Sequence, residues 1–238
     1  MEREHFEVKE TAVSIIAEKE FIKVAKDAIF EARRIIESKI SGDPFFGITY
    51  DPYPIRSSDE ALIQRMCKAS VVADVGPMAA VAGAVAAYAV EAMVSCGSTY
   101  AVVENGGDIS FINDRPLVIG LYAGDPGFDG ISLKMHPSEK IRGVCSSSGK
   151  IGPSVSFGDS SVSTVLSDDA ILADACATAL GNSIKDVSDL SPALEKIGSI
   201  CGVSGCIACH CGKIAFFGDI PELVHGRMEN GLITTLRS

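Results

Sequence analysis

The sequence has no cluster of lysine and arginine residues. Its 238 residues include 21 basic and 31 acidic side chains, so the formal net charge is −10. Proteins that bind nucleic acid or an anionic membrane surface present a basic patch to it. The charge balance therefore argues against both kinds of partner.

The sequence also lacks an apolar segment at its N-terminus. Met1–His5 is rich in charge, whereas a secretory signal needs a continuous apolar core. Eight cysteines without such a signal indicate free thiols in a reducing compartment rather than a disulfide framework. We therefore expect a cytoplasmic protein.

Only one long apolar run is present, Pro77–Cys96. It consists largely of alanine, which inserts poorly into a bilayer, and it contains Glu91. This composition favours a long alanine-rich helix buried inside the protein. Because no disordered linker and no repeat of fixed period interrupts the chain, we expect residues 1–238 to form a single α+β domain.

Hydrophobic periodicity supports the α+β class. Phe6–Ala17 alternates apolar and polar residues like a strand, and Glu18–Ile40 then takes helical spacing. The other expected elements are a loop over 44–56, a helix from Ser58 to about Ala69, strands over 99–104, 108–113, 117–122, 142–147 and 160–166, a helix capped by Ser167 that begins at Asp168–Asp169, a helix from Ser191–Pro192, and a hairpin over Gly205–Phe217.

The most informative motif is Asn105, Gly106, Gly107 and Asp108, between two expected strands. Adjacent glycines permit positive φ angles and let a ligand approach the backbone. An amide and a carboxylate flank them. The motif fits a tight hairpin turn, and it also fits a turn that binds a ligand.

A second polar pair lies on an apolar helix. Asp174 and Thr178 are four residues apart, so their side chains project from one helix face. A carboxylate beside a hydroxyl suits a hard cation such as Mg²⁺. A capped aspartate and a back-bonding threonine are the structural alternative. Because a carboxylate among core residues is costly without a partner, we favour a site.

Two further segments offer donors to an anion. Gly76 and Pro77 open the alanine-rich helix, where N–H groups point toward an incoming ligand. The other segment follows an expected strand and lacks the spacing of a Walker motif. It consists of Ser146, Ser147, Ser148 and Gly149.

Four cysteines near the C-terminus admit three interpretations: Cys201, Cys206, Cys209 and Cys211. The first three match the spacing of plant-type 2Fe–2S ligands. In the expected hairpin, however, Cys206 and Cys209 point to opposite faces. We therefore favour buried thiols over an iron–sulfur or zinc site and leave a redox or persulfide role open.

The order of these motifs resembles that of the ApbE-like superfamily, which includes the FAD:protein FMN transferases. The similarity extends over nearly the whole chain, and the block at residues 76–83 is similar to that of a sister family common in anaerobic archaea and bacteria. The matching segments are Glu10-Thr11, Asp74–Gly83, Val103–Ile109, Ser146–Gly149, Ser156–Gly158 and Ala173–Ala179.

The resemblance implies the ApbE-like fold, in which mixed and antiparallel sheets pack with helices. In the flavin transferases the counterparts of Asp174 and Thr178 help to bind Mg²⁺, and the counterpart of residues 105–108 lines the FAD site. The sister family is linked to sulfide assimilation and homocysteine formation, which implies partner proteins of anaerobic sulfur assimilation. Self-association into a homo-oligomer is left open.

Two departures concern the chemistry. Pro153 stands where related sequences carry a histidine, and Ala82-Gly83 replaces a Lys-Gly pair, so flavin transfer is expected to be slow or absent. The main prediction is a cytosolic protein that binds a nucleotide, flavin-like or other phosphorylated small molecule with Mg²⁺, in the service of anaerobic sulfur incorporation. The alternatives are a working FAD:protein FMN transferase and a non-catalytic binding or scaffold protein. No catalytic residue is assigned.

Overall fold

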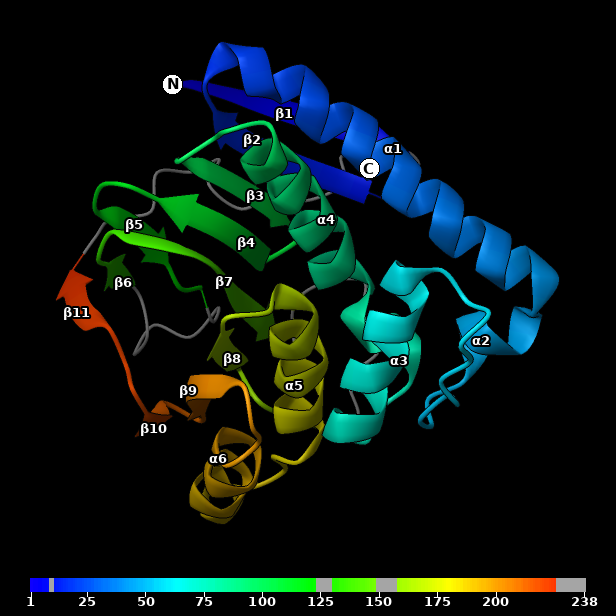
Figure 1. The fold of residues 1–238 in the computed structure, drawn as a ribbon. Coiled ribbons are helices and arrows are strands. Elements are labelled where there is room, and N and C mark those ends of the chain that lie inside the picture. The colour runs from blue at the N-terminus through cyan, green and yellow to red at the C-terminus, as the bar shows by residue number, and fades with distance from the viewer. Residues whose placement is uncertain (9–10, 123–129, 149–157, 226–238) are drawn as a thin grey trace.

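The computed structural model describes residues 1–8, 11–122, 130–148 and 158–225 (Figure 1). Its strands are β1 (Glu2–Val8), β2 (Thr11–Ala17), β3 (Ala101–Asn105), β4 (Asp108–Asn113), β5 (Leu117–Gly120), β6 (Ile131–Met135), β7 (Ser138–Ser147), β8 (Val162–Ser167), β9 (Val203–His210), β10 (Lys213–Gly218) and β11 (Glu222–His225). Its helices are α1 (Lys19–Gly42), α2 (Pro44–Ile48), α3 (Ala61–Ala73), α4 (Val81–Ser95), α5 (Ala170–Asn182) and α6 (Leu190–Gly198), with 3₁₀ turns η1 (Pro77–Ala80) and η2 (Val187–Asp189).

The strands form two sheets. The larger has eight strands in the order β1-β2-β3-β4-β7-β8-β9-β10, and the smaller has three in the order β11-β6-β5. Neighbouring strands are antiparallel in both sheets. Figure 1 shows α4 and α5 side by side over one face of the large sheet. The predicted α+β class with antiparallel sheets and packed helices is confirmed.

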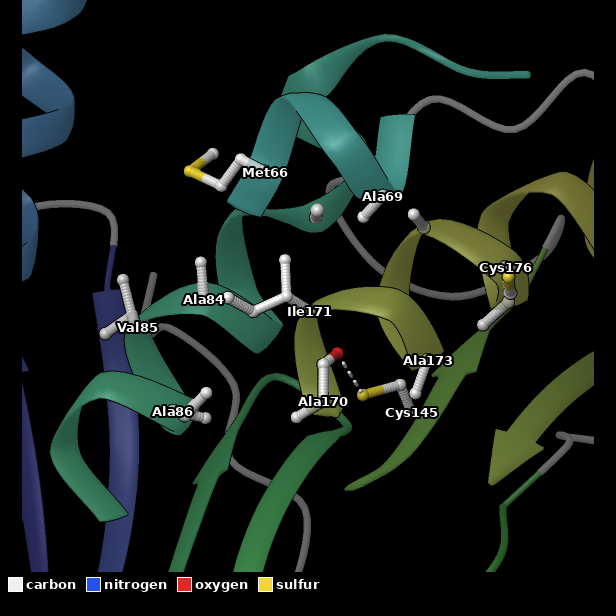
Figure 2. Packing of buried hydrophobic residues seen from close by; sticks show 14 of the residues in the cluster. Met66, Ala69, Ala84, Val85, Ala86, Cys145, Ala170, Ile171, Ala173 and Cys176 are labelled. Carbon is white, nitrogen blue, oxygen red and sulfur yellow. Dashed lines mark hydrogen bonds between the residues drawn. The ribbon is translucent and has the colours of Figure 1, made fainter. Parts of the chain in front are cut away.

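Strand alternation divides the buried side chains of the large sheet between two cores. Val103 and Cys145 point to the helix side and pack with residues of α3, α4 and α5, part of which Figure 2 shows. Their neighbours Val102 and Val144 point to the other side and pack with the small sheet. Successive strand residues face opposite sides, so each strand contributes to both cores.

The alanine-rich helix α4 lies in the helix-side core, as predicted. The segment Pro77–Ser95 has the length and hydropathy of a membrane span, yet 50% of it is buried inside the protein. It packs against α1, α5, β3 and β4. A Cβ atom on Gly83 would lie 2.4 Å from the carbonyl oxygen of Ala170, so this glycine lets the backbones of α4 and α5 approach closely.

Some element boundaries differ from the prediction near the N-terminus. The strand expected over Phe6–Ala17 is two paired strands, β1 and β2. The segment 44–56, expected as a loop, contains the five-residue helix α2, which starts at Pro44 and buries Phe46. The helix expected from Ser58 begins at Ala61.

Other differences concern the second half of the chain. Strands β6 and β11 were not predicted, and they complete the small sheet around β5. Asp169, not Ser167, caps α5 by accepting a hydrogen bond from the N–H of Ile171. Ser167 instead accepts from the N–H of Asp169, so it orders the residues just before the helix. Each side chain accepts from the N–H two residues further along, and sequence spacing cannot rank the two as caps.

Candidate functional site

The Gly106–Gly107 pair makes the turn between β3 and β4. Asn105 pairs with Asp108 across the hairpin, and the two glycines have φ angles of 66° and 105°. Two positive φ angles in a two-residue loop define the turn that suits the twist of a hairpin. A Cβ atom on Gly106 would meet nothing within 4 Å, and one on Gly107 would meet only the carbonyl of Ser146, at 3.7 Å. Among the residues that the structure describes, the turn therefore leaves open space beside its backbone.

Asn105 links this turn to α4. Its side-chain Nδ2 donates a hydrogen bond to the carbonyl oxygen of Ala82 at 3.1 Å, and the residue is 8% exposed. The amide donor predicted to contact a ligand thus has a partner within the fold. Asn105 holds the β3–β4 turn against the first turn of α4.

Asp174 on α5 caps the N-terminus of α4. Its Oδ2 accepts a hydrogen bond from the N–H of Gly83 at 2.8 Å, and the helix-terminal residue Ala80 provides no side-chain acceptor of its own. Burial raises the pKa of Asp174 to about 7, against the hydrogen bonds from the N–H groups of Gly83 and Ala82, which act to lower it. A carboxylate at a helix N-terminus is also favoured by the helix dipole.

The carboxyl group of Asp108 on β4 interacts electrostatically with that of Asp174. Burial raises the pKa of Asp108 well above its usual value, and the nearby charge of Asp174 raises it further. Its Oδ1 is buried and has no hydrogen-bond partner among the residues that the structure describes. Two enclosed carboxyl groups of like charge are thus brought together by β4 and α5, 66 residues apart in sequence (174 minus 108). This electrostatic arrangement favours either a shared proton or a bound cation.

Cys145 on β7 lies beside this carboxyl pair. It is paired with Asp108 across β4 and β7, and its Sγ donates to the carbonyl oxygen of Ala170 at 3.4 Å (Figure 2). Burial raises the pKa of the Cys145 thiol well above its usual value, and Asp108 and Asp174 raise it further. Cys145 is therefore a neutral thiol rather than a nucleophile.

The three serines that follow Cys145 differ in what they contact. Ser146 shares a hydrogen bond of 2.8 Å with Thr164 across β7 and β8, on the sheet face opposite to Cys145. The Oγ of Ser148 donates to the carbonyl of Ser161 at 2.8 Å. Ser147 is on the helix side, where a Cβ atom on Gly181 of α5 would lie 3.7 Å from its hydroxyl oxygen. Only one of the three hydroxyls thus faces α5.

The remaining predicted site residues are placed as follows. Thr178 is half-buried on α5, one helical turn beyond Asp174. Gly76 packs against α2, because a Cβ atom there would lie 2.0 Å from the carbonyl oxygen of Thr49, and Pro77 begins the 3₁₀ turn η1 rather than the α-helix. Gly149 and Pro153 lie outside the described residues.

Two contributors to the site were not predicted. Cys145 has no motif of its own, and its position follows only from its register opposite Asp108. The Ala82–Gly83 peptide lies between Asn105 and Asp174 and bonds to both. Gly83 was one indication of this contact, because a glycine permits close backbone approach. The two partners of the peptide, Asn105 and Asp174, are nevertheless distant from it in sequence. Cys206 and Cys209 do face opposite cores, as the alternation of strand residues predicted.

Solved structures with a similar fold include flavin transferases. The flavin transferase ApbE from Vibrio cholerae matches with a TM-score of 0.54 at 11% identity, over 91% of this chain and 96% of that one. The flavinyl transferase ApbE of Pseudomonas stutzeri matches with a TM-score of 0.55 at 10% identity, over 91% and 94%. At such identities the likeness concerns the fold alone.

The sequence comparisons define the family more closely. The chain belongs to the family described as AbpE bacteria, whose model matches residues 1–213. It is 42% identical over 229 residues to a UPF0280 protein of Methanocella arvoryzae, covering 96% of this chain and 94% of that protein. It is 44% identical over 241 residues to a UPF0280 protein of Archaeoglobus fulgidus, covering 98% and 99%. The resemblance to the ApbE-like superfamily is thereby confirmed.

Proposed function

We propose that this protein binds a nucleotide, flavin-like or other phosphorylated small molecule together with Mg²⁺, at the place where the β3–β4 turn meets α4 and α5. The proposal is carried by one observation: the buried Oδ1 of Asp108 has no partner among the described residues, and its carboxyl group interacts with the charge of Asp174. A divalent cation between the two would neutralise both charges and supply the missing contact.

The donor set fits a hard cation. Asp108, Asp174 and the hydroxyl of Thr178 are oxygen ligands, which Mg²⁺ prefers. Cys145 is a neutral thiol already bound to Ala170, so the set does not resemble that of a zinc centre. Within the described ranges there is no group of three or more His, Cys, Asp or Glu residues that could hold a metal. Ligand phosphates and waters would have to complete the shell, as is usual for Mg²⁺.

Charge explains why an anionic ligand would need the metal. The chain has a net charge of −10, and two carboxylates lie at the centre of the proposed site. Without a cation these charges repel a phosphate group. The open space at Gly106 and Gly107 would let such a ligand approach the backbone of the turn.

The test is a binding panel. FAD, FMN, ADP and inorganic pyrophosphate are each titrated into the protein by calorimetry, with Mg²⁺ or with EDTA. We expect at least one of these compounds to bind in Mg²⁺ with a Kd at least tenfold below its value in EDTA. The same compound should lose that advantage with Asp108→Asn. Absence of Mg²⁺-dependent binding across the panel would contradict the proposal.

A second candidate function is FAD:protein FMN transfer. The likeness of the fold to two ApbE transferases favours it. The substitution of the expected histidine by Pro153 weighs against it, because proline cannot accept a proton. A non-catalytic binding protein, retaining the ligand and lacking the transfer step, is the remaining alternative.

The finer predictions from the resemblance stay predictions. A role in anaerobic sulfur incorporation would need a reactive sulfur, and Cys145, the thiol in the proposed site, is held neutral. Partner proteins, a homo-oligomer, the cytoplasmic location and a single domain over residues 1–238 likewise await direct measurement. Growth of a deletion strain with sulfide as sole sulfur source tests the metabolic role.

A further inference from the structure

We propose that Cys211 and His210 form a reactive thiol–imidazole pair that undergoes thiol–disulfide exchange with a low-molecular-weight disulfide. The pair lies where β9 turns into β10, outside the carboxyl pair of the proposed Mg²⁺ site. It does not depend on the proposed function.

The geometry has the three parts of an activated nucleophile. The Sγ of Cys211 is 3.4 Å from the Nε2 of His210, and the Nδ1 of the same ring is 2.9 Å from the carbonyl oxygen of Asp159. A carbonyl only accepts hydrogen bonds, so Nδ1 carries the proton. In the neutral ring Nε2 is then free to accept the thiol proton. A nucleophile, a base and a group that orients the base are thus in contact.

The two side chains differ in their exposure. His210 is 8% exposed, whereas Cys211 is an exposed residue with a φ angle of 49° at the hairpin turn. The turn therefore presents the sulfur to solvent, while the packed imidazole remains fixed behind it. A disulfide needs only end-on access to a thiolate to react, and an exposed hairpin turn permits that approach.

An acidic side chain lies near His210. The pKa of Asp189 is lowered, chiefly by the N–H groups of Lys185 and Asp186 and to a smaller extent by His210. A carboxylate on η2 thus interacts with the imidazole.

The exchange step balances without any further reagent. The thiol proton of Cys211 passes to Nε2 of His210, and the thiolate attacks one sulfur of the disulfide. An S–S bond forms to Cys211 as the original S–S bond breaks. The leaving thiolate takes the proton from His210, so one disulfide and one thiol give one mixed disulfide and one thiol.

The pair is beside the serine-containing end of the sheet. The N–H of Ser161 donates to the carbonyl of Cys209 at 2.8 Å, and the carbonyl of Ser161 accepts from Ser148. Cys209, two positions before Cys211, is thus linked through Ser161 to Ser148, which follows β7.

The test uses the chain's own exposed cysteines as controls. Within the described residues Cys96, Cys201 and Cys211 are exposed, and the other five cysteines are buried. The native protein is treated at pH 7 with hydroxyethyl disulfide, which is uncharged, and the rate at each cysteine is followed by peptide mass spectrometry. Because among these three described residues only Cys211 has an imidazole base in contact with its sulfur, we expect it to react at least about threefold faster than Cys96 and Cys201.

Two comparisons identify the cause. His210→Gln should bring the rate at Cys211 to within about twofold of the other two cysteines, whereas His5→Gln, at an exposed strand position, should leave it unchanged. When the wild-type protein is unfolded in urea, Cys211 should react no faster than Cys96 and Cys201. This comparison does not require that His210→Gln folds. Equal native rates at the three cysteines, or an advantage that persists in urea, would overturn the proposal.

Discussion

The carboxyl group of Asp174 accepts a hydrogen bond from the backbone N–H of Gly83 at 2.8 Å, across 91 residues of sequence. It caps a helix whose own N-terminal residue, Ala80, has no acceptor to offer. The same carboxyl group interacts electrostatically with that of Asp108. The side chain of Asp174 therefore has two roles: it fixes α4 against α5, and it contributes a carboxyl group to the proposed site.

The stability of the metal-free protein should fall as the pH rises toward 8. Burial raises the pKa of Asp174 in the folded state to about 7, from its usual value of 3.8. A raised carboxyl pKa contributes stability that is fully present below the unfolded pKa and is lost as the pH rises through the folded pKa. Urea unfolding in EDTA should show a lower free energy of unfolding at pH 8 than at pH 5.5, by on the order of 1–3 kcal/mol. A higher value at pH 8 would contradict the assignment.

Asp174→Asn should leave the fold intact and reduce this pH dependence, while the raised pKa of Asp108 keeps a contribution of its own. The asparagine oxygen can still accept from the N–H of Gly83, while the buried charge is gone. At pH 8 in EDTA the variant should be as stable as the wild type or more stable. Asp174→Ala is the comparison, since it loses the cap and should cost about 1 kcal/mol relative to Asp174→Asn. Equal urea midpoints for both variants would show that the cap contributes nothing.

Gly83→Ala, at a buried position of α4, should destabilise the protein more than the addition of a methyl group at an exposed helix position. The new Cβ would lie 2.4 Å from the carbonyl oxygen of Ala170, and backbone must move to relieve the clash. We expect a loss of about 1–3 kcal/mol in the free energy of unfolding. Gly42→Ala at the end of α1 is the matched control, because its Cβ would meet nothing within 4 Å. Similar melting temperatures for the two variants would refute the close-contact explanation.

Much of the fold could be predicted from periodicity. The helical spacing of residues 18–40 and the alanine-rich run from Pro77 correspond to α1 and to η1 with α4. What sequence spacing missed are short elements stabilised by distant partners. Strands β6 and β11 are five and four residues long and exist as a sheet only with β5. Such pairing is set by tertiary contact rather than by local propensity.

The site was predictable in part, for a similar reason. Asn105 and Asp108 were identified because they flank two adjacent glycines, and Asp174 because a carboxylate among apolar neighbours needs a partner. Which partner each one has depends on register and on helix packing. The bonds from Asn105 to Ala82 and from Gly83 to Asp174 could not be read from either motif alone. Residues 149–157, where Gly149 and Pro153 were singled out, lie outside the described residues.

Flavin transfer to a protein acceptor should be absent or very slow. The reaction needs an activated acceptor hydroxyl and a stabilised leaving phosphate. Mg²⁺ at Asp174 would serve the second need, but Pro153 cannot serve the first. The assay is FMN attachment to a threonine-containing acceptor peptide, followed by fluorescence. Robust labelling by the wild-type protein would contradict this prediction and support the transferase function. A gain of activity in Pro153→His would show that the missing histidine is the missing base.

The most direct test of the proposed site is the binding of Mn²⁺ as a probe for Mg²⁺, followed by electron paramagnetic resonance, which reports free Mn²⁺. The titration uses wild-type protein, Asp108→Asn, and the exposed control Asp114→Asn, each with the phosphorylated compound that binds best. We predict one Mn²⁺ per chain for the wild type and for Asp114→Asn, and affinity at least about tenfold weaker for folded Asp108→Asn, since one of two carboxylate ligands is lost. Equal Mn²⁺ affinity in all three proteins, or no stoichiometric binding to the wild type, would contradict a cation site between Asp108 and Asp174.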